Sequence, residues 1–184
     1  MPILGIIASS ITGNLVTNSY ESISTVTVGS GGSASVTFSS IPATYTHLQI
    51  RCLAKTDNAG TTLETVSMTV NGNSLTKNHY LYGNGSVVLA GVGGSNVVMN
   101  ISSAGSTNIF GVAVIDILDY ANTNKNKTIR TLSGVDLNGS GELILYSNLY
   151  AVNTNAITSL SFSIPSLNIA QYSQFALYGV RGAQ

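Results

Sequence analysis

Charged residues are scarce in this chain of 184 residues. Asp, Glu, Lys and Arg make up 8% of it, against about 25% in an ordinary soluble protein. Seven basic residues balance seven acidic ones, so no net field attracts nucleic acid or an anionic membrane. We therefore expect neither nucleic acid nor a membrane among the partners. A net charge near zero also promotes association, which suits a subunit of a larger assembly.

Cysteine is limited to one residue, Cys52. This excludes an internal disulfide, so the fold does not depend on an oxidising compartment. Cys52 falls on the same side of an alternating pattern as Leu48 and Ile50, and no histidine or carboxylate is spaced to activate it. We expect a buried, unreactive thiol. Long apolar runs are also lacking, since none approaches the roughly 20 apolar residues of a membrane span.

Residue patterns that name a chemical reaction are lacking as well. His47 and His79 have no second ligand at metal-binding spacing, which argues against a zinc or iron site. The acidic residues are scattered singly. Asp116 and Asp119 lie three apart in a strand-like segment, hence on opposite faces, so they do not form a local acid and base pair.

Weaker ligand signals do not change this picture. The loop at Asp57-Asn58 offers oxygen atoms to calcium, but without an EF-hand pattern. The glycine clusters at 29–32 and 91–94 lack the helix and lysine of a phosphate-binding loop. We expect no catalytic residue, no metal and no cofactor, and the prediction is that the chain is not an enzyme. A glycosidase built from carboxylates distant in the sequence stays open.

Helical periodicity is absent beyond about two turns, and short alternating segments with Gly, Asn and Ser between them predict roughly ten strands. The expected fold is all-β, an antiparallel β-sandwich or jelly roll. The longest apolar run, 108–120, is the predicted central strand. Its two faces carry Phe110, Val112 and Val114, and Ile109, Ala113, Ile115 and Ile117. Because both are apolar, we expect the strand to be covered on both sides.

Turn chemistry predicts several connections. Asn71-Gly72 is the strongest hairpin signal, since both positions of a type I′ turn need positive φ. The glycine-rich turn at 29–32 predicts a hairpin between strands 20–28 and 34–38. The weak pattern from 77 to 94 predicts an irregular, exposed region. No linker divides the chain, so residues 20–184 are taken as one domain.

Residues 1–19 are expected to form an extended N-terminal arm. The segment is apolar from Ile3 to Ala8, but no Lys or Arg precedes Arg51, so the basic region of a secretory signal is missing. Such an arm can cover the sheet of its own domain or dock on a neighbouring subunit. Its predicted interface residues are Ile3, Leu4, Ile6 and Ile7.

Tyrosine is plentiful, with nine residues, while tryptophan is absent. Five of the tyrosines fall at potential outward positions: Tyr80, Tyr82, Tyr146, Tyr150 and Tyr178. Exposed aromatic rings stack on sugars or anchor subunit interfaces, and Tyr80 and Tyr82 are the candidate surface contacts. The alternative is that the rings cap the edges of the core with their hydroxyls in water.

Three segments carry a family resemblance: MPILGIIASS at the start, SYESISTVTVGSGGSASVTFSSIPATYTHLQIR, and QFALYGVRGA near the end. Together they resemble small virion structural proteins of tailed bacteriophages, over about a third of the chain. The resemblance implies a β-sandwich subunit of a virus particle, assembled in the host cytoplasm, and no enzymatic activity. The segment from 56 to 173 carries no such signature.

The resemblance leaves two roles open within the virion. The first is a capsid decoration or cement protein, a homo-oligomer such as a trimer. It would bind the major capsid protein or other virion proteins through many weak apolar contacts, strengthened by multivalency. The second is a tail or fibre component whose tyrosine-bearing loops contact host glycan. Outside the virion, a lectin or carbohydrate-active enzyme remains as a third hypothesis.

Overall fold

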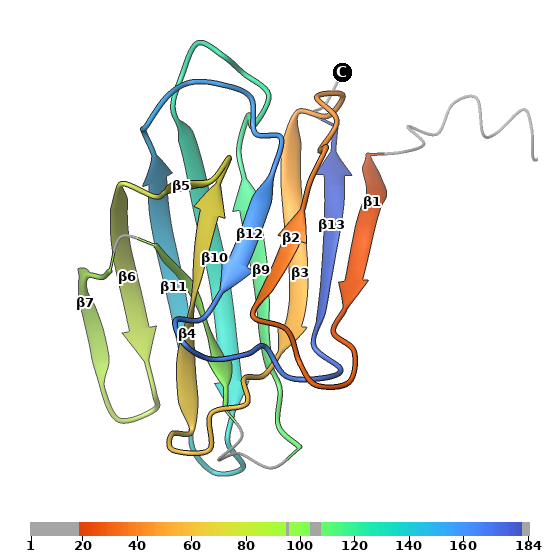
Figure 1. The fold of residues 1–184 in the computed structure, drawn as a ribbon. Helices are drawn as coiled ribbons and strands as arrows, with labels where there is room; N and C mark the ends of the chain where they lie inside the picture. Colours follow the sequence, from red (N-terminus) through yellow and green to blue (C-terminus); the bar gives the residue numbers. More distant parts are fainter. Residues whose placement is uncertain (1–18, 95, 104–107, 182–184) are drawn as a thin grey trace, which may run out of the picture.

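The protein is a β-sandwich of two antiparallel sheets, seen in a computed structural model that describes residues 19–94, 96–103 and 108–181 (Figure 1). The larger sheet has eight strands in the spatial order β1 (Tyr20–Thr27), β13 (Gln174–Val180), β3 (His47–Ala54), β9 (Gly111–Ile117), β10 (Lys127–Asp136), β11 (Gly141–Tyr150), β6 (Lys77–Gly83) and β7 (Val88–Val92). The smaller sheet has five strands: β2 (Ser35–Phe38), β12 (Leu160–Ser163), β4 (Leu63–Val70) and β5 (Asn73–Ser74) in that order, with β8 (Val97–Ser102) also paired to β4. The described residues thus confirm the all-β class and the β-sandwich.

The hydrophobic core lies between the two sheets, and the alternation of the sequence builds it. In β3 every second residue, from Leu48 to Ala54, is buried, because successive side chains of a strand point to opposite faces. Phe162 of β12 joins the sheets, since its ring lies 6.5 Å from that of Phe38 and 5.3 Å from that of Phe175 across the sandwich. Buried residues of both sheets form one continuous cluster.

The strand within the longest apolar run, β9, is central, being fourth of eight, but it is covered on one side only. Ile115 and Ile117 are fully buried, whereas Val112 and Val114 are 53% and 38% exposed. The expectation that both faces are covered is therefore wrong. The reason is that the sandwich has only two layers. The five-stranded sheet, in front of β9 and β10 in Figure 1, covers one face of the larger sheet.

The predicted hairpin between residues 20–28 and 34–38 is also wrong, because the two segments belong to different sheets. β1 pairs with β13, and β2 pairs with β12. Gly31 and Gly32 have φ of 86° and 74°, which glycine adopts readily. This lets the chain cross from one sheet to the other instead of folding back on itself.

Two other turn predictions are settled by the structure. Asn71 and Gly72 have φ of 48° and 74° and join β4 to β5, which confirms that hairpin. The stretch from 77 to 94 is exposed over most of β7 and the loop before it, but β6 includes the buried Asn78 and the half-buried Tyr80 and Tyr82. It is also regular, because β6 and β7 pair over five residues each. The expectation of an irregular region there is wrong, because cross-strand pairing compensates for a weak local pattern.

The first and last strands lie side by side, so the described chain begins and ends at one corner. The Arg181 amide donates to the Ser19 carbonyl at 3.0 Å. Close by, Gly179 lies beneath Tyr45, whose ring atoms would come within 2.3–2.5 Å of an added Cβ. The predicted arm residues Ile3, Leu4, Ile6 and Ile7 lie outside the described residues. Within the described parts, no helix is long and apolar enough to cross a membrane.

Candidate functional site

The most distinctive surface of this protein is the face of the eight-stranded sheet that points away from the five-stranded sheet, here called the outer face. Its side chains are identified by register, since residues that pair directly point to the same side. On β10, for example, Leu132 pairs with Val114 of β9 and with Leu145 of β11. Continuing outward, Leu145 pairs with Leu81 of β6. One cross-strand row is therefore apolar over four adjacent strands.

A second apolar row runs beside the first, two residues along each strand. Here Leu53 pairs with Val112, and Leu143 pairs with Gly83, which pairs with Val88 of β7. Together the exposed large side chains of the outer face form what we call the apolar patch: Leu53, Leu81, Val88, Val92, Val112, Val114, Leu132, Leu143 and Leu145. Their exposed fractions range from 38% to 86%.

The size of the apolar patch sets it apart from ordinary surface hydrophobics. Taking about 170 Å² for a fully exposed Leu or Val, it presents on the order of 800 Å² of accessible area, whereas the largest patch on a typical monomer is roughly 300–600 Å². Patches of this size on soluble proteins are interaction surfaces or aggregation sites. In a chain with so few charges, the patch is the strongest sign of a binding partner.

Glycine shapes the middle of the patch. Gly134 lies in the second row between Val112 and Leu143 and leaves a gap where its neighbours carry side chains. The resulting depression, about 330 Å³ in volume, is lined by Val112, Val114, Leu132 and Leu143 among others. A side chain from a partner can enter it, because the walls are almost entirely apolar and open to solvent.

A cluster of aromatic and polar side chains borders the patch toward β1. The Arg51 guanidinium lies 5.6 Å from the Tyr20 ring and 5.7 Å from the Tyr178 ring, within cation–π range. Arg51 Nε also donates to Gln49 Oε1 at 3.0 Å, and Gln49 Nε2 donates to Asp116 Oδ1 at 2.8 Å. Tyr and Arg beside an apolar centre are typical of the strongly contributing residues of protein interfaces.

The strand at the far edge of the patch is unprotected. β7 has no second neighbour among the described strands, and it is exposed on both faces. Val88 at 86% and Val92 at 74% lie on the outer face, and Leu89 at 50% lies on the opposite face. Edge strands usually carry a lysine, a proline or a bulge that blocks pairing with another chain, and the segment Val88–Val92 has none of these. The edge and the patch thus form one continuous exposed apolar surface.

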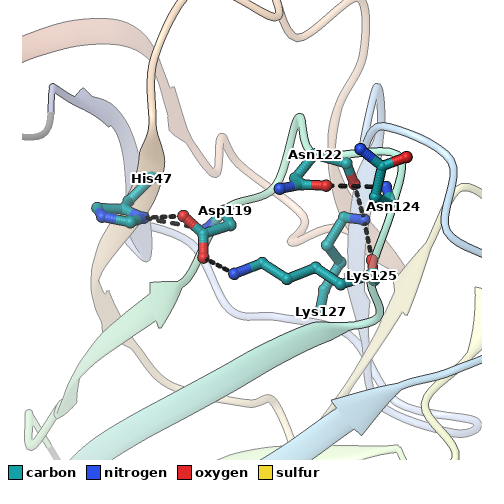
Figure 2. Close-up of polar contacts among 6 residues, drawn as sticks. All are labelled: His47, Asp119, Asn122, Asn124, Lys125 and Lys127. Atoms are coloured by element: carbon teal, nitrogen blue, oxygen red, sulfur yellow. Dashed lines mark hydrogen bonds and ion pairs between the residues drawn. The ribbon is translucent and has the colours of Figure 1, made fainter.

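A second group of polar residues gathers at the turn between β9 and β10 (Figure 2). The Asp119 amide donates to His47 Nδ1 at 3.0 Å, and the Asp119 carboxylate lies 3.5 Å from the same nitrogen. Lys125 Nζ binds the other carboxylate oxygen. That contact with Lys125 is the main reason why the pKa of Asp119 is held below its usual range.

Lys127, the first residue of β10, is fully buried in this turn. Its Nζ donates to three backbone carbonyls, those of Asn122, Lys125 and Thr154, the last two at 2.8 and 3.0 Å. Burial lowers the pKa of Lys127, since desolvation disfavours the ammonium. The lysine fastens two loops together from inside. Without access to solvent, it cannot act as a nucleophile on a substrate.

The turn cluster has little catalytic capacity. His47 accepts a backbone hydrogen bond through Nδ1, so this nitrogen is occupied by a structural contact and is not available as a base. Among the described residues no group of three or more His, Cys, Asp and Glu side chains could hold a metal ion.

Other predicted chemical groups have structural partners. Cys52 is buried, as predicted, and burial raises the pKa of its thiol to about 12. The Asp57 carboxylate, considered for calcium, accepts hydrogen bonds from the Asn168 amide at 2.9 Å and from its side chain at 2.8 Å. Those bonds hold the pKa of Asp57 below its usual range, and the bond from the Asn168 backbone amide has the largest effect.

Of the five tyrosines predicted to point outward, Tyr178 lies on the outer face, in register with Gln49, and the other four do not. Tyr146 and Tyr150 are buried, so the expectation is wrong for them. Tyr80 and Tyr82 are half-buried on β6, on the side that faces the core, and the Tyr80 ring packs edge-on against Tyr146 at 6.4 Å. Whether Tyr80 and Tyr82 contact a partner stays a prediction.

Sequence reasoning missed the apolar patch. The signal in the sequence is that β9 and β11 carry large apolar side chains on both faces, with Val112 and Val114, and Leu143 and Leu145, on the outer one. This pattern predicts a strand covered on both sides, but it is equally compatible with a sheet that has one apolar face open. Comparisons with protein-family models, with curated proteins and with solved structures found no match to this chain.

Proposed function

We propose that this protein is a structural subunit of a tailed-bacteriophage virion, a capsid decoration or cement protein that stabilises the shell through contacts between subunits. One observation carries the proposal: a rigid sandwich with very few charges leaves an apolar patch on the order of 800 Å² open on one sheet. Patches of this size mark interaction surfaces. The resemblance of the two ends of the chain to small virion proteins indicates the kind of assembly.

The position of Ser19 supports the same proposal. Ser19 lies beside Arg181 at the β1 edge, and β7 is at the opposite edge of the sheet. The predicted arm, with its anchors Ile3, Leu4, Ile6 and Ile7, precedes Ser19 in the sequence. An arm that docks on one neighbour and an apolar patch that packs on another give each copy contacts for different neighbours. Repetition of such contacts over a lattice provides affinity without charge.

The test is the copy number of this chain in purified particles, measured by quantitative mass spectrometry against the major capsid protein. A ratio near that of a shell subunit supports decoration of the capsid. A few copies per particle would refute decoration and place the chain in the tail, and complete absence would refute any virion role. Deletion of residues 1–10 tests the arm, and unchanged incorporation into particles would contradict its role.

The alternative is a tail or fibre component that contacts host glycan through Tyr80 and Tyr82. The geometry supports it less, because both rings are half-buried and face the core. A shallow depression at one end of the sheet, lined by Asp136, Glu142 and several glycines, is a more accessible place for a sugar. Binding of the isolated chain to a glycan array would favour this alternative.

A further inference from the structure

The apolar patch has a specific shape and charge, and both indicate what covers it. We propose that the outer face of the eight-stranded sheet is a homophilic interface, on which a second copy of this chain packs sheet against sheet. This inference rests on the proposed function, because it names the partner of that same surface.

The area fits a second copy. Specific protein interfaces bury roughly 800 Å² on each partner, and the patch offers on the order of 800 Å². Two sheets that pack face to face do so with their strands about 30° apart and about 10 Å between the layers. The second copy then supplies the layer that the chain itself provides on only one side of β9.

The relief of the patch is self-complementary. Leu132 and Leu143 protrude beside Gly134, whose depression has a volume of about 330 Å³. In a two-fold arrangement the same surface supplies both partners. A leucine of one copy can therefore enter the depression of the other, and the reverse contact occurs at the same time.

The charges of the outer face are compatible with a copy of itself. From residue 78 to residue 115 the sequence contains no Asp, Glu, Lys or Arg, so the patch residues of β6, β7 and β9 lie in uncharged stretches of sequence. The charged side chains beside the patch include Arg51, which is in register with Val114, and Arg130, which pairs in register with Asp116. A two-fold contact can bring Arg130 of one copy near Asp116 of the other, which favours the pairing over one with an acidic or basic partner.

The experiment measures association of the full chain by light scattering and sedimentation velocity over about 1–100 μM, a range that detects micromolar dissociation constants. We expect twice the monomer mass of 19.0 kDa. Leu132→Lys should weaken association at least about tenfold. Val152→Lys is the matched control, because Val152 lies in the loop after β11 and is 48% exposed, against 49% for Leu132. It should leave the dimer intact.

A third variant separates docking from folding. Gly134→Thr adds a side chain whose Cβ meets its nearest neighbours at 3.4–3.6 Å, so the strand accommodates it, while the depression is filled. We expect unchanged or higher thermal stability of the diluted protein and weaker association. Mixing Leu132→Lys with Leu132→Glu should restore association that each variant lacks alone.

Two results would overturn the interface. One is that the full chain stays monomeric at the highest concentration. If deletion of residues 2–11 then allows dimers to form, the interface is refuted as well, because the chain's own arm would be covering the patch. The other is equal association of Leu132→Lys and Val152→Lys. Failure of the interface is distinct from failure of the proposed function. A monomer that is present in particles at the copy number of a shell subunit refutes only the interface. A dimer that is absent from particles refutes only the function.

Discussion

Replacing Lys127 with methionine tests how the turn between β9 and β10 is held together. Methionine keeps the apolar stem of the side chain but removes the ammonium group. The three carbonyls that accept from Nζ, those of Asn122, Lys125 and Thr154, then lose their buried donor. The loop after β9 and the loop after β11 lose the group that joins them.

The magnitude follows from two opposing contributions. A hydrogen bond to a charged group contributes about 1.5–3 kcal/mol, and each carbonyl left unsatisfied costs about 1–3 kcal/mol. Against this, the desolvation of the ammonium, several kcal/mol in the native state, is no longer required. We expect Lys127→Met to lower the free energy of unfolding by about 2–4 kcal/mol.

The assay is urea unfolding at pH 7, with Lys125→Met as the control. Lys125 also belongs to the turn, but its side chain is 54% exposed in the ion pair with Asp119, and such surface pairs contribute about 0–1 kcal/mol. The midpoint should fall clearly for Lys127→Met and barely for Lys125→Met, with the slope unchanged. Equal effects of the two substitutions would refute the argument that the buried ammonium fastens the loops.

Three further predictions concern other parts of the molecule. Gly179→Ala should lower the free energy of unfolding by more than about 2 kcal/mol, because the new Cβ collides with the Tyr45 ring. In the control Gly29→Ala the new Cβ meets nothing within 4 Å, so this variant should be close to neutral. Equal melting temperatures of the two variants would contradict the prediction. Cys52 should resist a thiol reagent at pH 8 in the native protein and react on unfolding, since burial raises its pKa to about 12; fast native labelling would contradict the burial. The contact with Lys125 lowers the pKa of Asp119, so its contribution to stability is complete above the unfolded value of about 3.9 and is lost as the pH falls through the folded pKa. Asp119→Asn should therefore make acid unfolding less steep, and an unchanged pH profile would refute that contribution.

The sequence predicted well wherever the cause is local. Alternation placed Leu48, Ile50 and Cys52 on the buried side of β3, because the period of a strand is two residues and depends on no distant partner. Asn71-Gly72 predicted its hairpin, because positive φ is a property of those two residues.

Prediction failed wherever the cause is a partner distant in the chain. The glycine-rich turn at 29–32 predicts that residues 20–28 pair with the neighbouring segment 34–38, but their ladder partner is β13, about 150 residues later. The burial of Lys127 could not be predicted from the sequence, because it depends on backbone carbonyls from two loops. Pairing at long range is decided by the whole set of competing contacts, which local propensity does not encode.

The sequence by itself determined the all-β class, the inward side of β3, the turn at Asn71-Gly72 and the near absence of charge. Only the tertiary structure decided which strands are neighbours and which apolar face remains open. Val112 and Ile115 have the same chemical character in the sequence, yet one is exposed and the other buried. The physical reason is that the burial of a side chain depends on which layer covers its strand. The five-stranded sheet covers one side of β9 and leaves the other side exposed to solvent.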